Sequence, residues 1–129
     1  AALTGSGKHR NVAERSLGIL THLFDRAPRA VGWGLAAASA MIAGPLEVAV
    51  IDAGDGGGKD LVDVAWRSVL PGTVVVWGAG DDEQPLLHDR SMVDGVPTAY
   101  VCRDFVCDAP TTHVTDLALA VRAEIPAAS

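Results

Sequence analysis

Aromatic residues are scarce in this chain of 129 residues, at 5% of the sequence, whereas hydrophobic residues of all kinds make up 49%. The hydrophobic core must therefore be built mainly from Val, Leu, Ile and Ala side chains. A chain of this length buries roughly two-thirds of its unfolded surface, which is enough for one ordinary core. Glycine and proline are scattered and not repeated, which excludes a fibrous or low-complexity chain.

Runs of basic residues are absent. The sequence has 10 Lys and Arg against 16 Asp and Glu, and its formal net charge is −6. A nucleic-acid-binding protein needs a cluster of basic side chains to neutralise phosphates, and docking on an anionic membrane needs the same. We therefore expect neither nucleic acid nor a membrane as a partner.

Long hydrophobic runs and targeting signals are also lacking. The longest uncharged apolar stretch, residues 30–44, has about 15 residues, fewer than the roughly 18 to 20 that a transmembrane helix needs. No basic segment followed by a cleavage site marks a signal peptide. Two cysteines are too few for the disulfide framework of a small secreted domain. These absences favour a cytoplasmic location.

Two helices are expected in the first third of the chain. Residues 9–27 place apolar side chains such as Val12, Leu20 and Leu23 on one face, and Pro28 ends the pattern. Residues 31–43 (VGWGLAAASAMIA) are apolar on every side, and such a helix must be covered all round. We expect the chain to be the carboxy-terminal piece of a larger protein that covers this helix, and the isolated piece to self-associate. The alternative is a central helix enclosed by the chain's own α/β layer.

An α/β pattern follows. Residues 47–52 and 73–77 are rich in β-branched side chains and predict two strands, with a helix over residues 59–69 between them. This spacing is typical of a right-handed βαβ crossover. A polar connection over residues 78–97 leads to a third strand at 98–102, a hairpin return at 103–107 and a last helix over 113–124.

The sequence thus predicts a small, three-layer-like α/β unit. Its mostly parallel sheet of three or four strands contains one βαβ crossover and a C-terminal β-hairpin, and two helices precede it. We expect residues 1–44 and 45–129 to belong to separate domains.

A glycine-rich loop lies between the first strand and its helix. Its sequence, GDGGGKD at residues 54–60, lacks the first Gly of a phosphate loop, where Ala53 stands, and has Asp60 in place of the Ser or Thr after Lys59. A connecting loop is the favoured interpretation. Weak anion or nucleotide binding by Gly56, Gly57 and Gly58 at the helix start is the alternative.

The two cysteines are expected to face each other. If residues 98–109 form a hairpin with a two-residue loop at Asp104 and Phe105, Cys102 and Cys107 lie on opposite strands within reach of a disulfide. Three interpretations stay open: two reduced thiols packed in the core, which is favoured, a reversible redox pair, and part of a metal site. A complete metal site is not expected because no cysteine or histidine ligands with suitable spacing accompany them.

No catalytic constellation is visible. The four histidines are far apart in the sequence, and no serine stands in a nucleophile-elbow pattern. We predict no catalytic residue, no metal and no cofactor, and this chain alone is not expected to be an enzyme.

Several segments resemble the C-terminal end of the YyaL-like proteins, which contain a thioredoxin-like domain and are related to the spermatogenesis-associated protein of animals. The resemblance is carried by PLEVAV at 45–50, LPGTVVV at 70–76, PLL at 85–87 and above all DGVPTAYVCRDFVCDAPT at 94–111. It covers essentially the whole chain and is least distinctive in the helical first third.

The resemblance implies a larger protein with three parts. A thioredoxin-like domain comes first, then an (α/α)-toroid similar to N-acylglucosamine 2-epimerases and six-hairpin glycosidases, then this α/β end. On this basis residues 1–44 are the last helices of the toroid, and the rest of the parent chain is the partner of the present one. The parent is expected to act on a carbohydrate or in thiol redox chemistry, and this C-terminal module is expected to be non-catalytic.

Overall fold

A four-stranded mixed sheet forms the centre of the computed structural model, which describes residues 2–80 and 83–124. The strands β1 (Leu46–Ile51), β2 (Val74–Gly78), β3 (Thr98–Arg103) and β4 (Val106–Cys107) lie in the order β2-β1-β3-β4. The α/β class, the crossover and the hairpin are confirmed. The expectation of a mostly parallel sheet is wrong, because only β1 and β2 pair in parallel, whereas β1–β3 and β3–β4 are antiparallel.

The central strand β1 is buried on both faces. All six of its residues are buried, five apolar ones and Glu47, as is usual for a mainly apolar strand with a partner on each side. Its alternate side chains divide the interior into two hydrophobic clusters, one on each face of the sheet.

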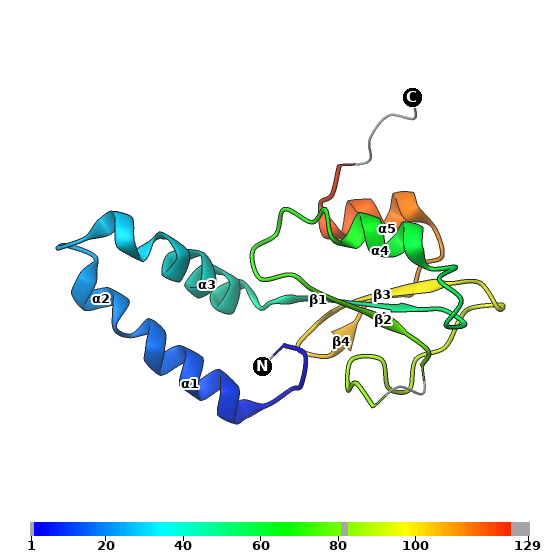
Figure 1. Ribbon diagram of the computed structural model, residues 1–129, viewed down its shortest axis with the longest axis horizontal. Coiled ribbons are helices and arrows are strands. Elements are labelled where there is room, and N and C mark those ends of the chain that lie inside the picture. The colour runs from blue at the N-terminus through cyan, green and yellow to red at the C-terminus, as the bar shows by residue number, and fades with distance from the viewer. Residues whose placement is uncertain (1, 81–82, 125–129) are drawn as a thin grey trace.

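Two helices cover one face of the sheet. The helices α4 (Lys59–Ala65) and α5 (Val114–Val121) lie side by side above the strands (Figure 1). Leu61, Val64, Leu117 and Val121 from these helices pack on Val48 and its neighbours in the sheet. Both helices are shorter than predicted, and Gly58 is the N-cap residue of α4.

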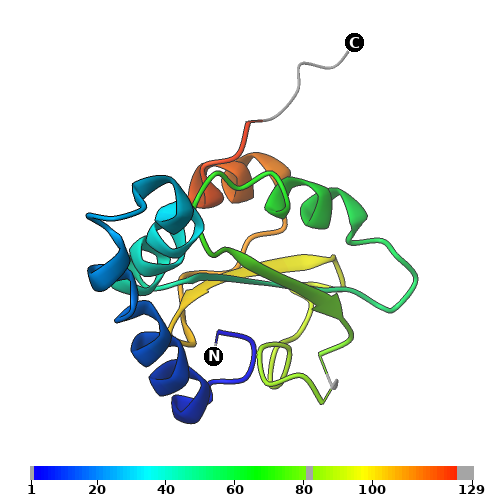
Figure 2. The same ribbon diagram turned by 60° about the vertical axis from the view of Figure 1, so that its left-hand side comes forward.

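A loop, and not a helix, covers the other face. Leu86 and Leu87, from the connection between β2 and β3, are fully buried against Ala49 and Ile51. Figure 2 shows this connection and the N-terminal segment beneath the sheet. The connection is therefore not simply polar, as the sequence suggested. Two leucines among polar residues give no periodic signal, which is why their burial was not predicted.

The first third of the chain forms a helical arm, which we define as residues 7–43. It contains α1 (Gly7–Leu17), the short α2 (Leu20–Leu23), a 3-10 turn (Pro28–Val31) and α3 (Gly32–Ala43). The single helix predicted over residues 9–27 is interrupted at Gly18. Figure 1 shows the arm extending from the start of β1 as an antiparallel pair of helices.

Most of the arm's apolar surface is exposed. None of the eleven residues of α1 is buried, and in α3 only Ala40 is. Trp33 is 92% exposed and Ile42 is 89% exposed. The alternative of a helix enclosed by its own α/β layer is therefore wrong. Within residues 2–80 and 83–124, no helix is long and apolar enough to cross a membrane.

Candidate functional site

The two cysteines meet at the end of the sheet, as the hairpin spacing predicted. Cys102 in β3 pairs in register with Cys107 in β4, and their sulfurs form a disulfide with a Cα–Cα distance of 3.9 Å. The sequence favoured two reduced thiols, and the structure shows the oxidised pair instead. Cys102 is 1% exposed and Cys107 is half-buried, so the two cysteines differ in their exposure to solvent.

The hairpin turn next to the disulfide has an unusual backbone. Asp104 and Phe105 both adopt positive φ angles, 48° and 64°. A two-residue hairpin loop requires such angles to match the twist of its strands, and Asn-Gly or Asp-Gly normally supplies them. Phenylalanine is disfavoured in this left-handed region. Contacts around the turn must therefore hold it in place.

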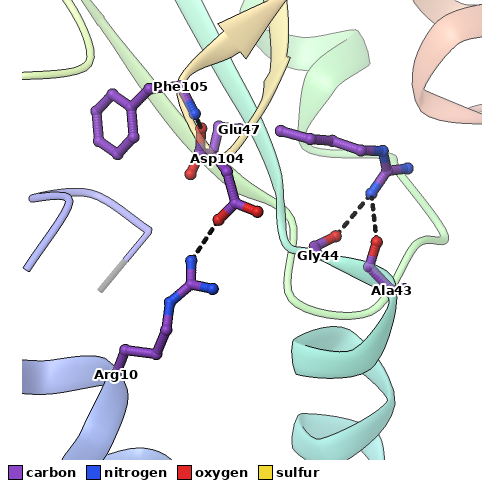
Figure 3. A network of polar contacts seen from close by, with 7 residues as sticks. Arg10, Ala43, Gly44, Glu47, Asp104 and Phe105 are labelled. Atoms are coloured by element: carbon purple, nitrogen blue, oxygen red, sulfur yellow. Dashed lines mark hydrogen bonds and ion pairs between the residues drawn. The ribbon is translucent and has the colours of Figure 1, made fainter. Parts of the chain in front are cut away.

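Phe105 is held on both its backbone and its ring. Its backbone N–H donates to Glu47 Oε2 at 2.9 Å (Figure 3). Glu47 is only 1% exposed and lies opposite Cys102 in the neighbouring strand. The ring packs on Gly5, where a Cβ atom would lie 3.3 Å from it. A buried carboxylate beside the hairpin is thus satisfied by the turn itself.

Arg90 is the cation beside the sulfurs. Its Nη2 donates to Cys107 Sγ at 3.0 Å and to Cys102 Sγ at 3.6 Å. Its Nη1 donates to the carbonyl oxygens of Leu86 at 2.6 Å and His88 at 3.3 Å. The guanidinium also lies 5.7 Å from the centre of the Tyr100 ring, within the range of a cation–π interaction. Four hydrogen bonds and one cation–π contact therefore hold a positive charge against the disulfide.

The segment that carries Arg90 is itself closely packed. A Cβ atom at Gly80 would lie 1.7 Å from the Arg90 carbonyl oxygen, so only glycine allows the two backbones to approach this closely. The Tyr100 hydroxyl donates to the carbonyl oxygen of Ser91 at 2.7 Å. The backbone at Arg90 thus packs on Gly80, and the next residue, Ser91, is bonded to β3 through Tyr100.

The hairpin turn also connects the sheet to the helical arm. Arg10 of α1 pairs with Asp104, and this hydrogen bond and charge raise the pKa of Arg10 above its ordinary value. Arg103 donates to the carbonyl oxygens of Gly44 at 2.6 Å and Ala43 at 3.5 Å. Figure 3 shows Arg10 and Asp104 pointing toward each other. Residues next to the disulfide therefore contact both helices of the arm.

In the glycine-rich loop, backbone N–H groups already donate to carboxylates of the same segment. Asp52, which is 3% exposed, accepts from the backbone N–H of Gly54 at 2.9 Å and of Gly58 at 3.2 Å. Asp55 accepts from Gly57 N–H at 2.9 Å. Two of the three proposed anion-binding glycines thus already donate to carboxylates. This arrangement does not favour an anion there.

A cleft of about 360 Å³ lies beside this loop. Trp66 and Trp77 line it and are 60% and 56% exposed, and Gly56 lies at its edge. Its Lys59 and Asp63 form an ion pair with each other. The cleft is apolar apart from groups that are already paired.

Metal binding has no support in residues 2–80 and 83–124. No group of three or more His, Cys, Asp or Glu side chains is placed to hold an ion there. His88 contacts Asp89, its neighbour in the sequence.

Comparison with protein-family models, curated proteins and solved structures finds no match. The resemblance of residues 94–111 to the YyaL-like proteins stays a prediction.

Arg90 was not predicted as a member of this site. It stands 12 residues before Cys102 in a connection without periodicity, and only the folded chain brings it to the sulfurs. The apolar pair at residues 86 and 87 carries Arg90 beneath the sheet, but two leucines in a polar connection give no periodic signal that could have located it.

Proposed function

We propose that this chain is a non-catalytic α/β module that docks through its helical arm on the helices of a larger protein. The observation that carries the proposal is the exposure of α3, where Trp33 and Ile42 are each about 90% exposed. A helix that is apolar on every side is stable in water only when other apolar surfaces cover it.

The chemistry of the arm indicates what covers it. Residues 32–43 include no charged side chain, so a charged partner surface would lose its hydration without gaining an ion pair. Gly, Ala and Ser make up eight of the twelve residues of α3, and small side chains let helices approach closely. Apolar helices therefore complement this surface best.

The identity of the larger protein rests on the resemblance to the YyaL-like proteins. On that basis the covering helices belong to an (α/α)-toroid of the same chain, whose first part is thioredoxin-like. The parent then acts on a carbohydrate or in thiol redox chemistry, in the cytoplasm.

Sedimentation of the isolated chain tests the docking surface. We expect concentration-dependent self-association, because the bare α3 faces can cover one another. The double substitution Trp33→Glu and Ile42→Glu should make the chain monomeric. Leu119→Glu on α5, at a residue that is 80% exposed but outside the arm, is the matched control and should leave association unchanged. A monomeric wild-type chain at high concentration would contradict the proposal.

A reversible redox pair at Cys102 and Cys107 is the second candidate function. The observation that favours it is the contact of both sulfurs with Arg90, because a cation stabilises a thiolate. A pair that opens and closes also fits a cytoplasmic location, where permanent disulfides are rare.

Mass spectrometry of the native chain tests the pair. We expect an increase of about two mass units on reduction, from the two hydrogens gained, and alkylation of two thiols only after reduction. Two thiols that alkylate without reductant, whatever oxidant is supplied, would remove this candidate.

A further inference from the structure

We propose that the Cys102–Cys107 disulfide exchanges with an external dithiol, that the attack falls on Cys107, and that Arg90 stabilises Cys102 as the departing thiolate. This inference rests on the second candidate function and adds to it the substrate class, the direction of attack and the residue that assists it.

Access to the sulfurs sets the direction of attack. Cys102 is 1% exposed, whereas Cys107 is half-buried and stands in a two-residue edge strand beside Val106, which is 77% exposed. A thiolate can reach only a sulfur that the protein surface presents. Cys107 therefore receives the incoming sulfur, and Cys102 is the leaving group. The exposed Val106 offers apolar contact to the partner beside the point of attack.

The departing sulfur needs a positive charge. A buried thiolate in apolar surroundings is costly, and the thiol pKa is raised there. Arg90 Nη2 lies 3.6 Å from Cys102 Sγ, so the negative charge forms beside a guanidinium that Leu86 and His88 already hold. The leaving group improves because a thiolate of lower pKa departs faster.

Other charges act on the same sulfur. The carboxylate of Glu47 lies opposite Cys102 in β1, and Asp104 and Asp108 flank the pair in the hairpin. These carboxylates disfavour a thiolate, and Arg10 pairs with Asp104 and not with a sulfur. Arg90 is therefore the cation that opposes them at the sulfurs.

The exchange balances as two displacements. A thiolate of the dithiol bonds to Cys107 Sγ, the Cys102–Cys107 bond breaks, and Cys102 leaves as a thiolate that takes up a proton. The second thiolate of the dithiol then bonds to the first sulfur of its own molecule, and Cys107 leaves and is protonated. The protein gains two electrons and two protons, and the dithiol becomes a disulfide. The reverse sequence reoxidises the protein.

Reduction of the full chain by dithiothreitol tests the role of Arg90. Arg90→Gln should slow the reduction roughly three- to tenfold, because the departing thiolate then loses the cation within 4 Å that stabilises its charge. Arg90→Lys, which keeps the charge, should be reduced at a rate between those of the wild type and Arg90→Gln. This variant still tests the role of Arg90 if the Gln variant does not fold. Arg67→Gln on the opposite side of the sheet removes the same charge and should reduce at the wild-type rate.

Single cysteine variants test the direction of attack. Cys102→Ser should form a mixed disulfide with glutathione disulfide through the half-buried Cys107. Cys107→Ser should react at least tenfold more slowly, because its remaining thiol is 1% exposed. Faster reaction of Cys102 would overturn the assignment of the attacked sulfur.

The outcomes distinguish a wrong role for Arg90 from a wrong assignment of the redox pair. If the disulfide forms and is reduced at equal rates in the wild type, Arg90→Gln and Arg90→Lys, the role of Arg90 is wrong and the redox pair stands. If no disulfide forms under any oxidant, the redox pair itself fails.

Discussion

At the scale of single residues, two glycines close to the C-terminal half of α3 share a positive φ angle but differ in their surroundings. Gly44 has a φ of 76° and Gly72 a φ of 75°. A Cβ atom at Gly72 would lie 2.5 Å from the Cβ of Ala40, whereas nothing lies within 4 Å of the same position at Gly44. Because Ala40 is the one buried residue of α3, its contact with Gly72 is where this helix rests on the α/β part.

This difference predicts unequal effects of the same substitution. Gly44→Ala costs only the placement of an alanine at φ 76° and ψ 123°, a conformation that alanine rarely adopts, on the order of 1–3 kcal/mol. Gly72→Ala adds the overlap with Ala40. The free energy of unfolding of this variant should therefore be about 1–3 kcal/mol lower than that of Gly44→Ala. Urea unfolding of both variants gives the comparison, and amide exchange in α3 shows whether the loss is confined to the arm. Equal losses would show that the contact does not hold α3 in place.

The cysteines and Arg90 show which single residues a sequence can place. The Cys102–Cys107 pairing depends on a two-residue turn and strand register, which are local, so it could be predicted from the spacing alone. The contact of Arg90 depends on how a long connection folds back under the sheet. No local rule gives that path, and Arg90 could not be predicted.

At the scale of elements, the strands were better predicted than the helices. Runs of β-branched residues in β1 and β2 give a strong signal because both strands are buried or half-buried. The helix predicted over residues 9–27 breaks at Gly18. Tertiary packing does not stabilise a longer helix there, because α1 buries none of its residues. The direction of β3 could not be predicted either, because a long connection allows a strand to enter a sheet from either end.

The burial of the sheet face opposite α4 and α5 was not predicted, for a related reason. Leu86 and Leu87 complete a cluster that also includes Ala49 and Ile51, yet they come from a segment without helix or strand. Pattern rules identify faces of regular elements and not single side chains of a loop. The third layer of this α/β unit is consequently a loop that also carries Arg90.

At the scale of the whole molecule, the hairpin turn joins the disulfide to the helical arm. Asp104, two residues after Cys102, pairs with Arg10 of α1, and Arg103 bonds to the end of α3. Phe105 anchors the same turn on Glu47. The disulfide closes the hairpin behind these contacts, next to the positive φ angles of Asp104 and Phe105.

Reduction of the disulfide should therefore loosen the arm. Without the crosslink the turn can relax toward negative φ angles, which moves the Asp104 carboxylate away from Arg10 and the Phe105 N–H away from Glu47. We expect amide exchange in α1 and at the start of β4 to become faster on reduction by severalfold, whereas α4 and α5, which pack on the opposite face, should keep their protection. The double variant Cys102→Ser, Cys107→Ser should match the reduced chain under oxidising conditions. Unchanged exchange in α1 would mean that the disulfide does not hold the helical arm, since the turn would then keep its conformation through Glu47 and Gly5 alone.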